Sequence, residues 1–172
     1  MFMIHWPLPR QDRYVAAFQG MIELLRDGRI RALGVSNFKP AHIDRLLAET
    51  GVTPDVNQIQ LNPRVARVRP RAYHARHGIV TESYSPLGRG GSLLTEPVIT
   101  HLAERYGKTP AQIVLRWHLE LGLVPIPKSA DPRRLAENID VFDFSLAPEE
   151  VIAISDLDEG EEAAIDSDLV GH

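Results

Sequence analysis

The chain has 172 residues, 44% of them hydrophobic and 24% charged, which is typical of one soluble globular domain with its own core. It contains no cysteine, and this excludes disulfides, thiolate metal sites and a thiol nucleophile. No segment is long and apolar enough to predict a membrane span, and the N-terminal residues lack a secretory pattern. We therefore expect a cytoplasmic protein that does not bind membranes.

The net charge of -4 is distributed unevenly along the chain. From Asp156 onward there are seven acids and no Lys or Arg, so about residues 156–172 are predicted to form an acidic, solvated tail. The preceding residues are slightly basic, but their excess of positive charge is too small to indicate nucleic acid binding. A phosphorylated small molecule suits them better as a ligand.

Short apolar runs alternate with segments of helical periodicity. Strands are predicted at residues 1–4, 30–35, 56–61, 79–84 and 123–126. Helices are predicted at residues 14–26, from Pro40 to about 51, 69–76, 97–106, 110–121, from Pro132 to about 138, and 148–157. Each strand is followed at once by polar or glycine residues, which is typical of parallel βα units. No linker interrupts them, so we expect one α/β domain over residues 1–172.

The last predicted strand runs directly into a helix that begins with several cations. Asp131 is a good N-cap, so the turn before it presents Lys128, the Ser129 hydroxyl and backbone N–H groups beside a helix N-terminus. Arg133 and Arg134 follow on the first turn. Such a corner attracts anions, phosphates above all. Solvated charges on a surface helix are the alternative explanation.

The polar residues at the strand ends are expected to share one edge of the sheet, because parallel strands place their carboxyl ends together. These residues are His5 and Trp6, Ser36 and Asn37, Gln58 and Gln60, Tyr84 and Ser85, and Lys128 and Ser129. No G-x-G-x-x-G motif follows any strand, which argues against a Rossmann arrangement. A barrel that holds phosphate after its last strands fits this pattern better.

Five strand-end motifs, in this order, closely resemble those of the aldo-keto reductase family: Ile4-His-Trp-Pro7, Gly34-Val-Ser-Asn37, Val56-Asn-Gln58, Tyr84-Ser-Pro-Leu-Gly88, and Ile126-Pro-Lys-Ser129 with Arg134-Leu-Ala-Glu-Asn138. The likeness runs from Ile4 to about Leu157. Residues 111–118 and 141–144 are similar to the bacterial branch that includes 2,5-diketogluconate reductases. The resemblance implies an α/β fold, an incomplete (β/α)8 TIM barrel that covers about strands 4 to 8, and it suggests that the sequence is N-terminally truncated.

The resemblance implies an oxidoreductase that transfers a hydride from NADPH to a small aldehyde or ketone. His5 would be the catalytic histidine that orients the carbonyl group, and Trp6 would contact the substrate. The implied cofactor contacts are Tyr84 on the nicotinamide, Ser36, Asn37 and Gln58 on its carboxamide, Ser85, Leu87 and Gly88 along the pyrophosphate, Lys128, Ser129 and Arg134 on the 2′-phosphate, and Glu137 and Asn138 on the adenine.

The same resemblance indicates what this sequence lacks. The family's catalytic aspartate, its proton-donating tyrosine and the lysine that acidifies the tyrosine all precede the position of His5, so we expect the chain as written to be inert or nearly so. A non-catalytic NADP-binding fragment or subunit-like interaction module is the alternative, and exposed strand edges suggest self-association. We expect no metal site, since His74 and His77 fit a surface helix better than a metal pair.

Overall fold

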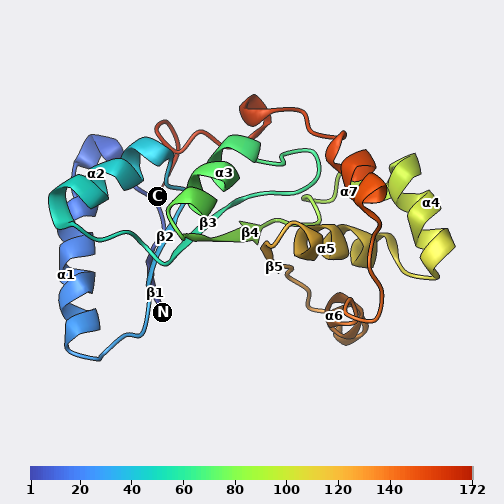
Figure 1. Ribbon diagram of the computed structural model, residues 1–172, viewed down its shortest axis with the longest axis horizontal. Coiled ribbons are helices and arrows are strands. Elements are labelled where there is room, and N and C mark those ends of the chain that lie inside the picture. The colour runs from blue at the N-terminus through green and yellow to red at the C-terminus, as the bar shows by residue number, and fades with distance from the viewer. Residues whose placement is uncertain (172) are drawn as a thin grey trace. The chain divides into compact units, whose positions relative to one another are not determined.

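The computed structural model describes residues 1–171. Its helices and strands follow the order β1 (Phe2–Ile4), η1 (Pro9–Gln11), α1 (Tyr14–Arg26), β2 (Leu33–Ser36), α2 (Pro40–Thr50), β3 (Val56–Gln60), α3 (Val68–Arg76), β4 (Val80–Tyr84), η2 (Ser92–Thr95), α4 (Pro97–Tyr106), α5 (Pro110–Glu120), β5 (Val124–Ile126), α6 (Pro132–Ile139), α7 (Pro148–Ser155) and η3 (Glu161–Ala163). Within these residues the five strands form one sheet in chain order, as in part of a (β/α)8 barrel (Figure 1). The predicted fold class is confirmed.

Two compact units can be described separately. The first contains residues 1–59, 67–82 and 165–171, and the second contains residues 60–66 and 83–164. The expectation of a single domain stays a prediction.

The first unit is built on parallel strands whose register is fixed by a buried central strand. All four residues of β2 are buried, and β2 pairs in parallel with β1 on one side and β3 on the other. Helices α1 and α2 pack against each other, and their apolar faces meet the sheet in one core. Phe18, Val35 and Ile43 lie at its centre with no exposed surface. The register also sets Ser36 opposite Gln58, which places two predicted site residues side by side.

One strand begins later than predicted. The apolar run 30–35 predicted a strand from Ile30, but β2 begins at Leu33. The backbone N–H groups of Arg29 and Ile30 both donate to the carbonyl of Leu24, at 2.9 and 3.3 Å, so these residues close the end of α1. The N–H groups of Arg29 and Ile30 are therefore not available to pair with a neighbouring strand.

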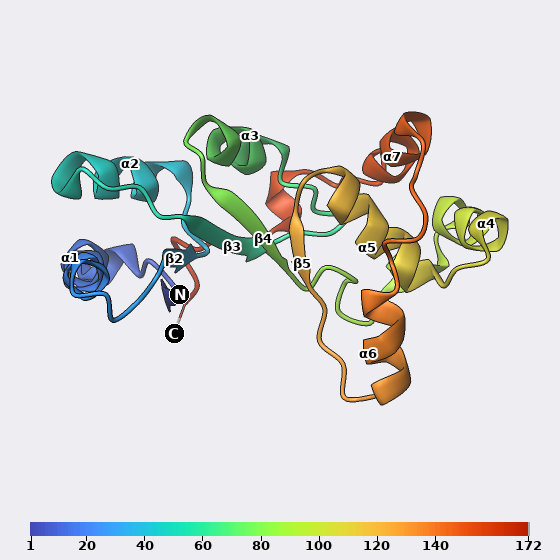
Figure 2. The ribbon, with the colours of Figure 1, turned by 60° about the horizontal axis from the view of Figure 1, so that its bottom comes forward.

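The second unit is a helical layer that covers the β5 segment. Helices α4, α5 and α7 pack on one another, and α6 lies beside α5 (Figure 2). Trp117 on α5 is fully buried, and its indole Nε1 donates to the Ser155 hydroxyl of α7 at 3.0 Å. This hydrogen bond satisfies the polar atom of the largest buried side chain and fixes α7 against α5.

The N-cap of α5 gives a testable prediction about the stability of this unit. Thr109 caps the helix: its hydroxyl accepts from the Gln112 N–H at 3.3 Å, while the Gln112 side chain accepts from the Thr109 N–H at 2.9 Å. We expect Thr109→Ala to lower the free energy of unfolding by about 1 kcal/mol, measured by urea denaturation. Thr100→Ala is the control, because that hydroxyl bonds only to carbonyls of its own helix and N-cap. Equal losses in the two variants would contradict the capping role.

Apolar side chains are exposed on the two strands at the ends of the sheet order. Phe2 on β1 is 55% exposed, and Val124 and Ile126 on β5 are 41% and 46% exposed. The self-association expected from these strands stays a prediction. Among residues 1–171, none of the helices combines the length and apolarity needed to cross a membrane.

Candidate functional site

The ends of β2 and β3 join through a compact set of hydrogen bonds. The Ser36 hydroxyl and the Asn37 N–H both donate to the Gln58 carbonyl at 2.9 Å. The Asn37 side-chain amide then donates to the Ser36 hydroxyl at 3.0 Å and to the His5 carbonyl at 3.1 Å. Asn37 has a φ of 64°, a left-handed conformation that asparagine tolerates better than most residues. These bonds hold the polar ends of three neighbouring strands together.

The side chain of Gln58 faces the same side of the sheet as a carboxylate on the next strand. Its Nε2 donates to Glu82 Oε2 at 2.9 Å, which leaves the amide oxygen of Gln58 as an acceptor for another group. Residues on the opposite side of the two strands, such as Asn57 and Thr81, are buried. Glu82 is in none of the predicted motifs, whereas the structure places it beside a predicted site residue.

His5 and Trp6 follow β1 and differ in exposure. His5 is exposed, and its ring centre lies 5.8 Å from that of Trp6 in a tilted arrangement. Trp6 is only 9% exposed. A histidine that is accessible beside a largely covered aromatic ring can present an imidazole N–H to a small polar group while the indole supplies an apolar wall.

In the second unit, β4 ends in a tight glycine-containing turn. Ser85 has a φ of 51°, and its carbonyl accepts from the Gly88 N–H at 3.0 Å. Gly88 itself has a φ of 72°, a conformation that favours glycine. Arg89 donates from Nε to the Ser85 hydroxyl at 3.1 Å, and its guanidinium lies 6.0 Å from the centre of the Tyr84 ring. Arg89 therefore adds a cation at this turn, one residue beyond the predicted motif Tyr84-Ser-Pro-Leu-Gly88.

The predicted anion corner has the local structure that its sequence indicated. The Asp131 side chain accepts from the Arg133 N–H at 2.9 Å and caps α6, with a proline in the first turn. The Ser129 hydroxyl accepts from the Asp131 N–H at 3.1 Å, which folds the segment before the helix into a turn. The Arg133 side chain is 88% exposed, so of the two arginines only Arg134 lines a cavity here.

A cavity of about 340 Å³ lies at this corner, and the structure brings six predicted residues around it. Its lining comprises Leu87, Leu94, Thr109, Pro110, Ala111, Lys128, Ser129, Arg134, Glu137 and Asn138. The predicted residues of the β4 turn, Tyr84, Ser85 and Gly88, do not line it. The lining also includes four residues that were not predicted as site residues, which come from η2 and the start of α5: Leu94, Thr109, Pro110 and Ala111.

The chemistry of this lining suits a phosphorylated nucleoside. Lys128 and Arg134 can pair with phosphate oxygens, and the Ser129 hydroxyl can donate a further hydrogen bond. Leu87 and Leu94 offer apolar surface, and Glu137 and Asn138 offer hydrogen-bonding groups to a base. The volume lies at the lower end of the range of small-molecule pockets, as expected for a site that takes only part of a ligand.

A second cavity in this unit has a different character. It has a volume of about 350 Å³ and lies between α5, β5 and α6, where its lining residues other than Asn138 are apolar. Leu135, Ile139 and Phe142 are among them. Such a lining has nothing to neutralise a phosphate, so the two faces of α6 are chemically distinct.

His74 was expected on a surface helix, and this expectation is wrong. Its side chain is fully buried, with Nε2 2.9 Å from the Asn57 amide nitrogen and Nδ1 2.8 Å from the Thr81 hydroxyl. Asn57 also donates to the Phe38 carbonyl at 2.8 Å. His74 therefore links α3 to β3 and β4. Within residues 1–171, no group of three or more His, Asp or Glu residues is arranged to hold a metal ion.

Comparisons with known proteins place this geometry in context. Residues 1–159 match the model of the aldo/keto reductase family. Methylglyoxal reductase DkgA of Escherichia coli K12 is 51% identical in an alignment of 172 positions that covers 99% of this chain and 62% of that protein. An aldo-keto reductase of Mycolicibacterium smegmatis is 49% identical over 160 residues, covering 93% of this chain and 58% of that protein.

Solved structures agree with the sequence comparison. A mutant of Gox0644 in complex with NADPH superimposes with a TM-score of 0.94 and 43% identity, over 99% of this chain and 63% of that one. An aldo-keto reductase from Bombyx mori in complex with NADP gives a TM-score of 0.82 and 36% identity, over 91% of this chain and 56% of that one. The chain thus spans about three-fifths of the length of these relatives.

Proposed function

Because this chain belongs to the aldo/keto reductase family, we propose that it carries the NADPH-binding part of a carbonyl reductase. The observation that carries the proposal is the cavity at the start of α6, where Lys128, Ser129 and Arg134 come together with Glu137 and Asn138. Two cations beside one hydroxyl favour a cofactor with an extra phosphate on its adenosine, so NADPH should bind better than NADH.

We assign the residues of the second unit to the phosphates and the base. Lys128, Ser129 and Arg134 bind the 2′-phosphate, and Glu137 and Asn138 contact the adenine. Separately, Ser85, Leu87 and Gly88 line the pyrophosphate, and Tyr84 stacks on the nicotinamide. The family motif supports these roles, and so does the turn at Ser85, whose left-handed backbone shapes the loop after β4.

In the first unit, we assign Ser36, Asn37 and Gln58 to the nicotinamide carboxamide. The hydrogen bonds among them hold donors and acceptors in place before a ligand arrives, which lowers the entropic cost of binding. When bound, NADPH supplies the hydride that reduces the carbonyl carbon to an alcohol. His5 donates a hydrogen bond that orients the carbonyl oxygen, and Trp6 excludes water from the side of the substrate.

The substrate class is proposed as small aldehydes and ketones. Methylglyoxal is the first to test, since DkgA of Escherichia coli is a methylglyoxal reductase. The chain itself contains no tyrosine–lysine pair among the assigned residues to supply the proton that the alkoxide oxygen needs. We therefore propose cofactor binding without efficient turnover for the 172-residue chain.

The purified 172-residue chain tests the proposal by titration with NADPH and NADH, followed by nucleotide fluorescence. We expect NADPH to bind at least about tenfold more tightly, the equivalent of one charge-assisted contact. Equal affinities for NADPH and NADH would contradict the proposal that the cavity at Lys128 binds the 2′-phosphate. In the same samples, methylglyoxal should consume NADPH no faster than the buffer control. A rate that His5→Ala abolishes would show instead that the chain is an active reductase.

A further inference from the structure

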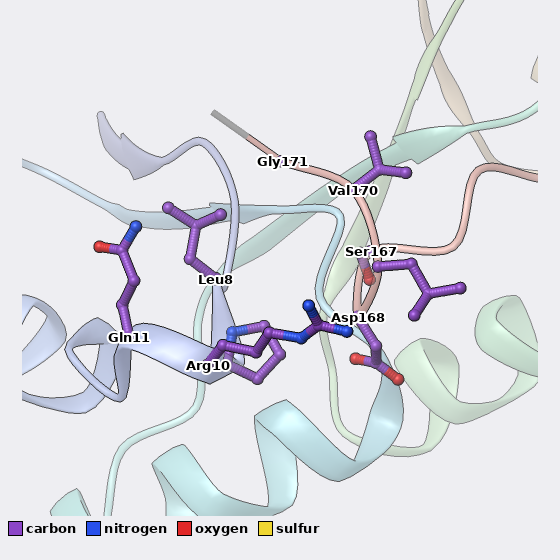
Figure 3. Close-up of a pocket in the computed structure, with 9 residues that line it drawn as sticks. Leu8, Arg10, Gln11, Ser167, Asp168, Val170 and Gly171 are labelled. Atoms are coloured by element: carbon purple, nitrogen blue, oxygen red, sulfur yellow. The ribbon is translucent and has the colours of Figure 1, made fainter.

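The C-terminal segment Ile165–Gly171 belongs to the first unit, where it lies along the loop after β1. Figure 3 shows Leu8, Arg10 and Gln11 across from Ser167, Asp168, Val170 and Gly171, and the residues enclose a cavity of about 160 Å³. Composition predicted that the acidic tail would be solvated. The structure shows that this part of it is bound to the rest of the unit.

Two carboxylates hold the segment through one lysine. The Lys39 ammonium, just before α2, donates to Asp166 Oδ1 and to Asp168 Oδ2, each at 2.5 Å. The hydrogen bond from Lys39 holds the pKa of Asp166 below its ordinary value, so the carboxylate stays charged at neutral pH. About a third of the Lys39 side chain remains exposed, and salt can screen these pairs.

His42 adds a third contact with a defined tautomer. Its Nδ1 accepts from the Lys39 backbone N–H at 3.1 Å, so Nε2 carries the proton, and Nε2 lies 2.9 Å from Asp168 Oδ1. Burial lowers the pKa of His42 although Asp168 opposes this effect. At neutral pH the contact is therefore one between a neutral imidazole and a carboxylate, and Lys39 supplies the positive charge.

The far end of the segment covers Trp6. A Cβ atom at Gly171 would lie 2.6 Å from Leu8 Cδ2 and 3.3 Å from Trp6 Cβ, so only glycine fits here without movement of its neighbours. This close approach accompanies the low exposure of Trp6, the residue assigned above to the wall beside the substrate.

We propose that Lys39 is a positioning residue that, through Asp166 and Asp168, holds the C-terminal segment against Leu8 and Trp6. Lys39 at the N-cap of α2 and His42 in its first turn thereby control how far Trp6 is covered, and the covered form presents a closed wall that suits small carbonyl compounds. We call the contacts of Lys39 with Asp166 and Asp168 the clasp. Only the role of Trp6 beside the substrate rests on the proposed function, because the clasp is a property of the chain without any ligand.

Amide hydrogen exchange of the ligand-free chain tests the clasp. The N–H groups of Asp168, Leu169 and Val170 all donate to Asp166, so their exchange reports the opening of the turn that Lys39 holds through Asp166 and Asp168. Lys39→Ala is expected to raise their exchange rates roughly fivefold, which corresponds to the loss of two partly exposed ion pairs. Acrylamide should also quench more of the tryptophan fluorescence in this variant, since Trp117 is buried and Trp6 is the residue uncovered.

Three further variants make the result specific. Lys39→Arg should restore slow exchange, because arginine can also bridge two carboxylates. Lys108→Ala is the matched control: this lysine also contacts two aspartates, Asp140 and Asp143, but in the second unit. It should leave the exchange of residues 168–170 unchanged. The Asp166→Asn/Asp168→Asn double variant, on the surface segment, should behave like Lys39→Ala and replaces it if that variant fails to fold.

The outcome that overturns the proposal is wild-type exchange and wild-type quenching in a folded Lys39→Ala or Asp166→Asn/Asp168→Asn chain. Raising the salt concentration to 1 M gives an independent check, since it should speed exchange in the wild type and have little effect in Lys39→Ala. Because no nucleotide or substrate is present, a failure here is distinct from a failure of NADPH binding.

Discussion

Replacing Lys128 with alanine is expected to weaken NADPH binding by about tenfold and to leave NADH binding nearly unchanged. The lysine lines the cavity at α6 together with Arg134, where the proposed ligand group is the 2′-phosphate that only NADPH carries. Arg134→Ala should give a loss of similar size. The two losses need not add in the double variant, because both side chains would contact one phosphate. Titration calorimetry with both nucleotides measures each effect.

The matched control for this prediction is Arg133→Ala. Arg133 is on the same turn of α6, but its side chain is 88% exposed and does not line the cavity. It should change NADPH affinity by less than about twofold, as expected for a screened surface charge. If Arg133→Ala weakened binding as much as Lys128→Ala, the effect would reflect the general field of the helix, and the specific contact would be excluded.

The sequence predicted the local backbone structure of this corner, because neighbouring residues determine it. A good N-cap at Asp131 and the proline after it determine where α6 begins, and the preceding residues then have to lie beside the helix start. That Ser36 and Gln58 lie close together could also be predicted from the sequence, since parallel strands place their carboxyl ends at one edge. In both places, neighbouring residues or simple strand geometry decide the arrangement.

The clasp of the C-terminal segment could not be predicted in the same way. Lys39 and His42 belong to none of the strand-end motifs, and the acidic tail was predicted to be solvated. Their contact joins residues about 130 positions apart along the chain. Surface charges give no periodic pattern that selects one partner among many carboxylates, so only the folded chain shows which acids Lys39 binds.

The burial of His74 also could not be predicted from the sequence. His74 and His77 were assigned to a surface helix because no carboxylate or third histidine lies at a metal-ligand spacing from them. Burial of His74 depends on Asn57 and Thr81, which come from two different strands and offer hydrogen bonds inside the core. A single buried polar residue is stable when such partners exist, and sequence periodicity does not report them.

The buried histidine makes the stability of the first unit depend on pH. Burial, helped by the nearby charge of Arg67, lowers the pKa of His74 from 6.5 to about 4 in the folded chain. In the unfolded chain the imidazole takes up a proton below about pH 6.5, whereas the folded chain binds it only near pH 4. The unfolded state therefore binds more protons in this interval, and the free energy of unfolding falls as the pH falls.

We expect this one group to remove about 3 kcal/mol of stability between pH 7 and pH 4. His74→Gln should lack this loss, because an amide can bond to Asn57 and Thr81 without titrating, although imperfect geometry should cost about 1 kcal/mol at pH 7. Urea denaturation at several pH values gives the two curves. Their difference isolates His74, since the carboxylates and His42 titrate alike in both chains.

His77→Gln is the matched control for this comparison, because His77 is the C-cap residue of the same helix but is only half-buried, stacked on Tyr73. It should keep the pH dependence of the wild type. If His74→Gln lost stability toward pH 4 as steeply as the wild type, the neutral buried imidazole would not be what limits the fold in acid. The protonation of His74 would then have to be accommodated inside the core, where Asn57 and Thr81 already occupy both ring nitrogens.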